Sequence, residues 1–192
     1  MKEIDFVLDN YLATSITTVA GHSQRRKVVG GAPTIVDNII ETDLPAILKK
    51  LVSEQGRNAS EYKIYGSVGQ PNRYVAKIPW VAVLHRTITS STTHGYYIVL
   101  LFREDMAGCV LSLNQGFTHF KRAFGTDELA RRKVQEAAEV AATYLTIPSV
   151  FVTGKIDLSA TGDMGVGYEE GAIVSKIYDD PSTLSESVLT VC

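Results

Sequence analysis

Residues 65–86 read YGSVGQPNRYVAKIPWVAVLHR, residues 95–105 read GYYIVLLFRED, and residues 108–124 read GCVLSLNQGFTHFKRAF. Aromatic and β-branched residues dominate the centre of each stretch, whereas glycine, proline and asparagine gather at the ends, as is typical of strands and turns. The pattern predicts four strands, over residues 62–68, 78–85, 95–103 and 108–113. The connections are short, which favours antiparallel neighbours because parallel pairing needs a long crossover.

Helical periodicity precedes these strands. Apolar residues at i, i+3, i+4, i+7 and i+8 predict a helix over residues 4–12, with Leu12 on its buried face. A second helix follows, which Thr42 or Asp43 caps and Gly56 ends.

A third helix is predicted after the strands, over residues 127–145, with Thr126 as its cap and an alanine-rich packing face. One strand over residues 155–158 and a glycine-rich stretch follow. We therefore predict an α+β fold in which helices flank a mostly antiparallel, curved sheet. We expect a single domain over residues 1–180 and a tail over 181–192, to which the sequence assigns no role.

Composition narrows the class of protein. The chain has 192 residues, of which 45% are hydrophobic and 21% charged, an ordinary globular balance. No apolar run is long enough to cross a membrane and the acidic N-terminus has no signal core, so we expect a cytoplasmic protein with no membrane partner. Cys109 and Cys192 form no CxxC pattern and the four histidines have no ligand spacing, so we predict no metal and no cofactor.

The charge distribution leaves nucleic-acid binding open. The formal net charge is −2, whereas nucleic-acid-binding domains are often strongly basic. Cationic side chains nevertheless outnumber acidic ones between residues 119 and 133. They are Lys121, Arg122, Arg131, Arg132 and Lys133. Such a cluster can bind phosphate, but a solvated helix face explains it equally well.

Catalytic motifs are weak. Gly154-Lys155 lacks the other residues of a phosphate-binding loop, and a flexible loop explains Gly165-Val166-Gly167 better than a nucleotide site does. Asp43, Glu61 and Lys63 are the residues that a metal-dependent nuclease would use, although Asp43 serves better as a helix cap. We therefore expect no enzymatic activity, with the nuclease as the least favoured alternative.

The strands bring aromatic residues to one face of the sheet. Trp80 shares a face with Leu84, and Tyr97 shares one with Leu101, because alternate residues of a strand point the same way. If the two strands are neighbours, Trp80 lies near Tyr97 and Leu101. Two rings and a leucine can grip a flat ring from both sides. From this pattern alone a hydrophobic core is favoured over a pocket.

Six motifs, in order along the chain, carry a resemblance to a known family. They are GSVGQ at 66–70, IPW at 78–80, GYY at 95–97, LSLNQG at 111–116, KIDL at 155–158 and GYEEG at 167–171. The sequence resembles, over about residues 40–180, the N-terminal DNA-binding domain of McrB-type modification-dependent restriction proteins. This resemblance implies that the chain binds double-stranded DNA and flips a modified base, a methylated cytosine, into a pocket of Trp80, Tyr97 and Leu101.

The resemblance also implies that the loop at residues 69–72, with Gly69 and Gln70, approaches the duplex and helps to occupy the vacated space. From the position of this loop, we expect phosphate or groove contacts from its neighbours. These are Ser67, Asn72, Arg73 and Tyr74.

McrB-type proteins carry a GTPase motor after this domain, so we expect a nuclease or an NTPase motor as a partner, in trans or on a further part of the chain. The alternative from another class is an adaptor that recruits such a motor or nuclease and touches DNA only weakly, which the net charge of −2 favours.

Overall fold

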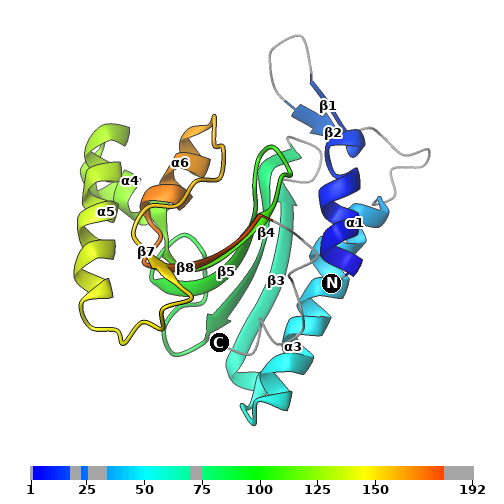
Figure 1. Cartoon of the computed structure of the whole chain (residues 1–192). Helices are drawn as coiled ribbons and strands as arrows, with labels where there is room; N and C mark the ends of the chain where they lie inside the picture. Colours follow the sequence, from blue (N-terminus) through cyan, green and yellow to red (C-terminus); the bar gives the residue numbers. More distant parts are fainter. Residues whose placement is uncertain (1, 18–22, 26–33, 70–74, 180–192) are drawn as a thin grey trace.

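The computed structural model describes residues 2–17, 23–25, 34–69 and 75–179. Its centre is a six-stranded antiparallel sheet in the order β3-β4-β5-β6-β8-β7. Its strands span Tyr62–Gly69 (β3), Val75–His85 (β4), Tyr96–Phe102 (β5), Cys109–Gln115 (β6), Val152–Thr153 (β7) and Val174–Tyr178 (β8). The sheet is curved and helices cover both of its faces, which confirms the predicted α+β class (Figure 1). A separate hairpin pairs β1 (Ser15–Thr17) with β2 (Ser23–Arg25).

The first four predicted strands correspond to β3, β4, β5 and β6. β4 is longer than expected, because it begins at Val75. Its register places Trp80 opposite Leu101 of β5 and opposite Ser67 of β3. These pairings set which side chains meet on each face of the sheet.

One face of the sheet is covered by the first helices. They are α1 (Lys2–Asn10), α2 (Ile35–Asn38), the π-helical turn η2 (Ile39–Asp43) and α3 (Leu44–Glu54). The last three follow one another without a break. The predicted cap at Thr42 or Asp43 is therefore wrong, since both are helical and Asp43 makes no capping hydrogen bond. Thr34 caps the segment instead, in a reciprocal capping box with Asp37.

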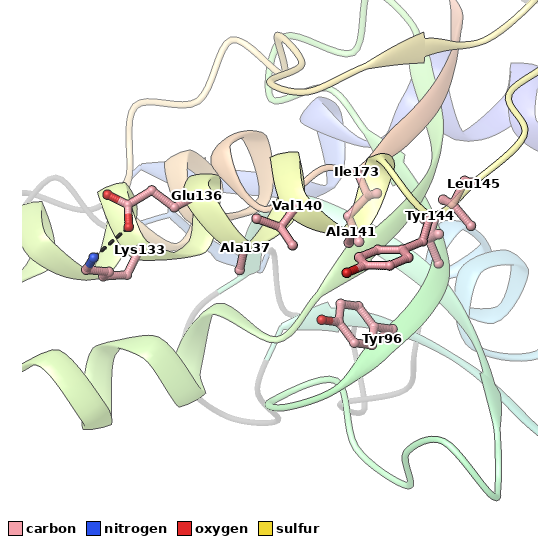
Figure 2. Close-up of a pocket in the computed structure, with 10 residues that line it drawn as sticks. Tyr96, Lys133, Glu136, Ala137, Val140, Ala141, Tyr144, Leu145 and Ile173 are labelled. Atoms are coloured by element: carbon pink, nitrogen blue, oxygen red, sulfur yellow. Dashed lines mark hydrogen bonds and ion pairs between the residues drawn. The ribbon is translucent and has the colours of Figure 1, made fainter.

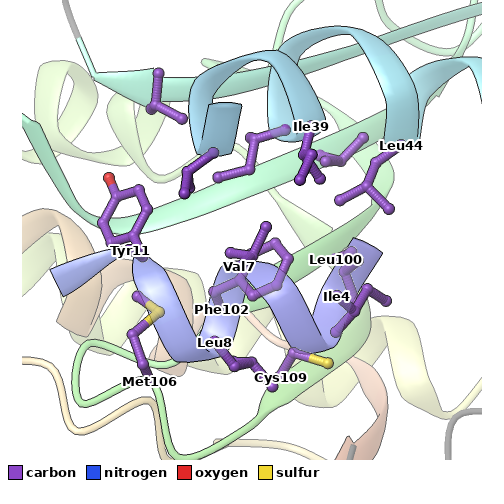
Figure 3. Close-up of a cluster of buried hydrophobic side chains, with 14 of the residues drawn as sticks. Ile4, Val7, Leu8, Tyr11, Ile39, Leu44, Leu100, Phe102, Met106 and Cys109 are labelled. Carbon is purple, nitrogen blue, oxygen red and sulfur yellow. The ribbon is translucent and has the colours of Figure 1, made fainter. Parts of the chain in front are cut away.

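The π-helical turn lies directly on the edge strand β3. A Cβ atom at Gly66 would stand 1.9 Å from the carbonyl oxygen of Ile40, so only glycine permits this approach. Apolar side chains of α1 then meet those of the central strands, with Val7 near Phe102 and Leu8 near Cys109 (Figure 3). Leu12 is exposed rather than buried, because α1 ends at Asn10.

On the other face lies α6 (Asp163–Glu170), against which α4 (Phe117–Phe124) and α5 (Asp127–Ala142) pack. α5 and its Thr126 cap confirm the third predicted helix, although it ends at Ala142. α4 was not expected from the sequence. The expected flexible loop at residues 165–167 is wrong, since these residues lie within α6. Gly167 serves packing, because a Cβ atom there would stand 2.0 Å from the Phe117 ring.

The strand predicted at residues 155–158 is also wrong. Among the described residues this segment pairs with no strand, and β7 and β8 flank it in sequence instead. The buried carboxylate of Glu169 holds it in place, accepting hydrogen bonds from the backbone N–H of Leu158 (2.8 Å) and of Ala160 (3.2 Å). The periodicity of apolar residues in the sequence cannot predict such a contact between a side chain and a distant backbone.

Two short 3-10 turns complete the fold, η1 (Leu12–Thr14) before the hairpin and η3 (Ala59–Glu61) before β3. Within the described ranges, no helix combines the length and apolar character that a membrane span requires. The tail at residues 181–192 lies outside those ranges.

Candidate functional site

An aromatic cluster occupies the sheet face under α6. Trp80, Tyr97 and Leu101 belong to the same hydrophobic cluster, together with Tyr65 of β3 and Tyr168 of α6. The register explains this arrangement. Trp80 pairs with Leu101, and Tyr97 lies four residues before Leu101 on β5, so its side chain points to the same face of the sheet. The structure thus brings together the three residues of the predicted pocket.

Burial differs sharply within the cluster. Leu101 is fully buried and Tyr97 is only 3% exposed, whereas Trp80 and Tyr65 are half-buried. The Tyr65 ring stands edge-on to the indole, with 5.4 Å between ring centres and 75° between planes. The two half-buried rings therefore form the outer margin of the cluster, and Leu101 lies at its base.

The hydroxyl group of Tyr97 is buried and has no hydrogen-bond partner within the described parts of the chain. Burial, followed by the nearby hydroxyls of Tyr168 and Tyr65, raises the pKa of Tyr97 far above its ordinary value, so the phenol stays protonated. A buried polar group without a partner costs about 1–3 kcal/mol. Its hydrogen-bonding capacity is therefore available to a group that enters the cluster.

Tyr168 closes the cluster from the side of α6. Its own backbone carbonyl accepts a hydrogen bond of 2.9 Å from the Asn114 side chain on β6. Burial raises the pKa of Tyr168 to about 12, and the Trp80 side chain partly opposes this shift. The side chains of Tyr97, Tyr168 and Trp80 thus belong to one cluster.

β3 leads directly from this cluster to the predicted DNA-binding loop. A bulge interrupts its pairing with β4 between Ser67 and Gly69, and the Gly69 N–H donates to the Ser67 hydroxyl oxygen (3.3 Å). Gly69 has a φ of 114°, which side chains other than hydrogen rarely allow. The chain therefore leaves the sheet at Gly69, which pairs with Val75 and follows by two residues the Ser67 that pairs with Trp80. The remaining predicted DNA contacts lie outside the described residues; they are Gln70, Asn72, Arg73 and Tyr74.

The residues of the nuclease alternative are engaged elsewhere. Lys63 donates a hydrogen bond to the carbonyl oxygen of Ser90 (3.0 Å), and Glu61 lies 3.7 Å from the His85 ring nitrogen. Asp43 lies in the π-helical turn before α3. Among the described residues, no group of three or more His, Cys, Asp or Glu side chains could hold a metal ion. The geometry gives this alternative no support.

The basic cluster of residues 121–133 is largely neutralised by acids. Lys121 and Arg131 both bind the carboxylate of Asp163 at the start of α6, and Lys121 also lies 2.9 Å from Asp127. Hydrogen bonds with Asp163 and then Asp127 raise the pKa of Lys121. These ion pairs join α4, α5 and α6, so this part of the cluster is a structural junction rather than a bare phosphate-binding surface.

A hollow lies away from the aromatic cluster, along the C-terminal half of α5 (Figure 2). It has a volume of about 600 Å³ and shares the lining residues Leu113 and Leu145 with a smaller hollow of about 230 Å³. Tyr144 is 84% exposed at its rim, and the ion pair of Lys133 with Glu136 (2.6 Å) closes one end. The remaining lining residues of the larger hollow are Tyr96, Ala137, Val140, Ala141 and Ile173. We call the two hollows the α5 groove.

The α5 groove is separate from the aromatic cluster. Tyr96 lines the groove and precedes Tyr97 on β5, so the two side chains leave the sheet on opposite sides. Sequence reasoning missed this groove. The available signal was that Val140 and Tyr144 lie off the alanine face of α5.

Comparisons with known proteins bear on the chain as a whole. A family model described as "MrcB-like, N-terminal domain" matches residues 10–191, which include the whole six-stranded sheet and the aromatic cluster. No curated protein and no solved structure matches the chain.

Proposed function

Because the chain belongs to the family of MrcB-like N-terminal domains, we propose that it recognises a modified base, a methylated cytosine, in double-stranded DNA. Membership of this family gives the chain a McrB-type DNA-binding role. The proposal adds that the modified base is flipped out of the duplex and held between Trp80, Tyr97 and Leu101.

One observation supports the pocket most strongly. The Tyr97 hydroxyl is buried, has no hydrogen-bond partner among the described residues, and belongs to the same cluster as the half-buried Trp80 ring. Flipping a base costs a few kcal/mol, and stacking on an aromatic ring returns about 1–3 kcal/mol per base. A hydrogen bond from the base edge to the Tyr97 hydroxyl would remove the cost of leaving that group unpaired.

Each residue of the cluster takes a part in this proposal. Leu101, which is fully buried, forms the apolar floor. Trp80 forms the wall that the base reaches first, since it is more exposed than Tyr97. A methyl group on cytosine adds apolar area that such a floor can bury, worth about 25 cal/mol per Å².

In the proposal, the loop after β3 contacts the DNA. Gly69 ends β3 two residues after Ser67, which pairs with Trp80. In the proposal Gln70 helps to fill the space that the base leaves, and Ser67 contacts the backbone. Asn72, Arg73 and Tyr74 supply further phosphate or groove contacts.

The proposed biological role is the targeting part of a modification-dependent restriction system. The chain then needs a nuclease or an NTPase motor, in trans or on a further domain, and carries no chemistry itself. Glu61 and Lys63 each contact another residue of the protein rather than each other, which agrees with this division of labour.

Paired binding measurements test the proposal. Duplexes that differ only in one methylated cytosine are titrated with the wild-type chain, with Trp80→Ala and with Tyr144→Ala as the control on the α5 groove. We expect the wild type and the control to prefer the methylated duplex, and Trp80→Ala to bind it about 5- to 150-fold more weakly. Equal wild-type affinity for both duplexes would defeat the proposal.

The α5 groove favours a second candidate function. An exposed apolar groove is a common protein-binding surface, so the chain could act as an adaptor that recruits a motor or a nuclease. Salt dependence separates the two functions. A DNA reader loses affinity for DNA steeply as salt rises, because each neutralised phosphate releases counterions. A nearly flat salt dependence of weak DNA binding would favour the adaptor.

A further inference from the structure

We propose that Lys63 of β3 and the hydroxyl-rich loop of residues 87–94 bind phosphates of the DNA backbone beside the flipped base. The inference rests on the proposed function and adds to it the surface that holds the duplex next to the pocket. Its evidence is the spacing, the charge and the hydrogen bonds of the residues between this loop and the aromatic cluster.

Lys63 lies in a row of side chains that leads to the aromatic cluster. Alternate residues of a strand point the same way, so Lys63, Tyr65 and Ser67 follow one another along one face of β3. Ser67 pairs with Trp80 of β4, which places this row beside the proposed pocket. The row covers about 13 Å, because a strand rises about 3.3 Å per residue. This length is close to four base-pair steps of about 3.4 Å, so a DNA backbone along β3 can meet both ends of the row.

The ammonium group of Lys63 is held in place without being neutralised. It donates a hydrogen bond to the carbonyl oxygen of Ser90 (3.0 Å) and lies 4.7 Å from the centre of the Tyr65 ring. Within the described ranges it forms no ion pair with a carboxylate, in contrast to Lys121 and Arg131, which both bind an aspartate. A lysine ammonium has three N–H donors, so the hydrogen bond to Ser90 leaves donors for a phosphate.

Arg86 adds a second positive charge at this end of the sheet. Its backbone N–H donates to the carbonyl oxygen of Glu61 (2.9 Å), which continues the ladder between β3 and β4 beyond His85. The Arg86 side chain is exposed and donates from Nε to the carbonyl oxygen of Ser60 (3.1 Å). The carboxylate of Glu61 lies 3.7 Å from the His85 ring nitrogen. An approaching phosphate therefore meets two cations, Lys63 and Arg86, that no carboxylate of the described residues neutralises.

The 87–94 loop supplies oriented hydroxyl groups. The buried hydroxyl oxygen of Thr89 lies 2.9 Å from each of two carbonyl oxygens of the same loop, which holds the loop in one conformation. The Tyr65 hydroxyl donates to the hydroxyl oxygen of Thr92 (3.3 Å), so Thr92 keeps its own proton to donate to a phosphate. Because the Tyr65 ring also stands edge-on to Trp80, a single side chain joins the loop to the aromatic cluster.

The salt dependence of DNA binding tests the contact of Lys63. Each neutralised phosphate adds about 0.9 to the slope of log affinity against log salt, because it releases counterions. We expect Lys63→Gln to lower this slope by about 1 and to weaken binding about 5- to 10-fold at about 0.1 M salt, for methylated and unmodified duplexes alike. Lys63→Arg should keep the slope. So should Lys49→Gln, the same change at an exposed lysine of α3, which covers the opposite face of the sheet.

Thr92→Val tests the loop, because it keeps the shape of the side chain and removes the hydroxyl group. We expect this variant to bind both duplexes about 3- to 10-fold more weakly, as the loss of one hydrogen bond predicts. Its salt slope should equal that of the wild type, since the hydroxyl group carries no charge. An unchanged affinity of Thr92→Val would remove the loop from the interface.

The outcomes separate this inference from the proposed function. If the wild type binds both duplexes equally, recognition of the modified base fails, while the slope of Lys63→Gln still decides whether Lys63 contacts a phosphate. If Lys63→Gln keeps the wild-type slope, the inference is overturned, whatever the preference of the wild type for methylated DNA. A loss of affinity at an unchanged slope has the same consequence, because it marks a purely structural contact between Lys63 and Ser90.

Discussion

The two faces of the central sheet are built from the same strands, yet they are filled differently. Between the sheet and α1 to α3 lies a hydrophobic core, in which Val7, Leu100 and Phe102 are completely or almost completely buried (Figure 3). Between the sheet and α6 lies a second cluster, in which Trp80 and Tyr65 are only half-buried and the buried Tyr97 hydroxyl has no hydrogen-bond partner among the described residues. The first cluster is a closed core, and the second is the place where we propose that the base binds.

The largest expected effect is a loss of stability from a substitution in the core between the sheet and α1 to α3. Phe102→Ala should lower the free energy of unfolding by about 3–5 kcal/mol, because it leaves a cavity among side chains that cannot collapse into it. Denaturant unfolding measures the change. Trp80→Ala, on the half-buried margin of the other face, should lose less stability. A larger loss for Trp80→Ala than for Phe102→Ala would reverse the assigned roles of the faces.

A second prediction concerns the close contact of the π-helical turn with β3. Gly66→Ala should destabilise the fold by about 1–3 kcal/mol, because the added methyl group meets the backbone of Ile40. Gly162→Ala is the control, since a Cβ atom there meets only Lys77 at 4.0 Å. Thermal unfolding of both variants provides the comparison. Similar losses in the two variants would show that the contact contributes nothing.

The third prediction concerns the buried hydroxyl of Tyr97, for which we expect opposite effects on stability and on DNA binding. Tyr97→Phe should leave the free energy of unfolding unchanged or raise it by up to about 2 kcal/mol, because it removes a buried hydroxyl that has no described partner. The same change should reduce the preference for methylated DNA. Stability and binding are measured on the same preparation. Marked destabilisation would mean that the hydroxyl already has a structural partner.

A fourth prediction tests the junction that holds α6. Burial alone would raise the pKa of Asp163, but hydrogen bonds from Lys121 and Arg131 lower it overall. The ionised carboxylate therefore stabilises the fold above its ordinary pKa of 3.8, and this stabilisation is lost as the pH falls through the lower pKa of the folded chain.

Asp163→Asn should accordingly cost no more than about 1 kcal/mol at neutral pH, since the group is partly solvated. The difference from the wild type should shrink as the pH falls below 3.8. Unfolding curves recorded between neutral and acidic pH measure it. A difference that stays constant over this range would contradict the role of the ion pairs.

The smallest expected effect lies at the α5 groove. Tyr144→Ser should change stability by less than about 0.5 kcal/mol, because the side chain is 84% exposed. DNA affinity should not change either, and a gel-shift titration checks this. A loss of DNA binding would extend the interface to α5.

Strand alternation was sufficient to predict β3 to β6 and the face that Trp80 shares with Tyr97 and Leu101, but it missed β7 and β8. It could not distinguish a core from a site, because both place apolar and aromatic residues at alternate positions. The feature on which we base the proposed site is the buried hydroxyl of Tyr97, which has no partner among the described residues.

The errors in the prediction have physical causes. Gly165 and Gly167 indicate a loop by composition, but here small residues let α6 pack against its neighbours. The 155–158 segment has the apolar alternation of a strand, yet Glu169 satisfies its backbone from a distance in sequence. Thr34 was overlooked as a cap because a π-helical turn disrupts the spacing of the helix that it starts.

The fluorescence of Trp80 tests the central claim most directly, because the chain has no other tryptophan. A base that stacks on the indole should quench its emission. We predict that a duplex with one methylated cytosine quenches the emission and that the quenching saturates together with binding, while the unmodified duplex gives little change. Tight binding of the methylated duplex without any change in the emission of Trp80 would contradict the account.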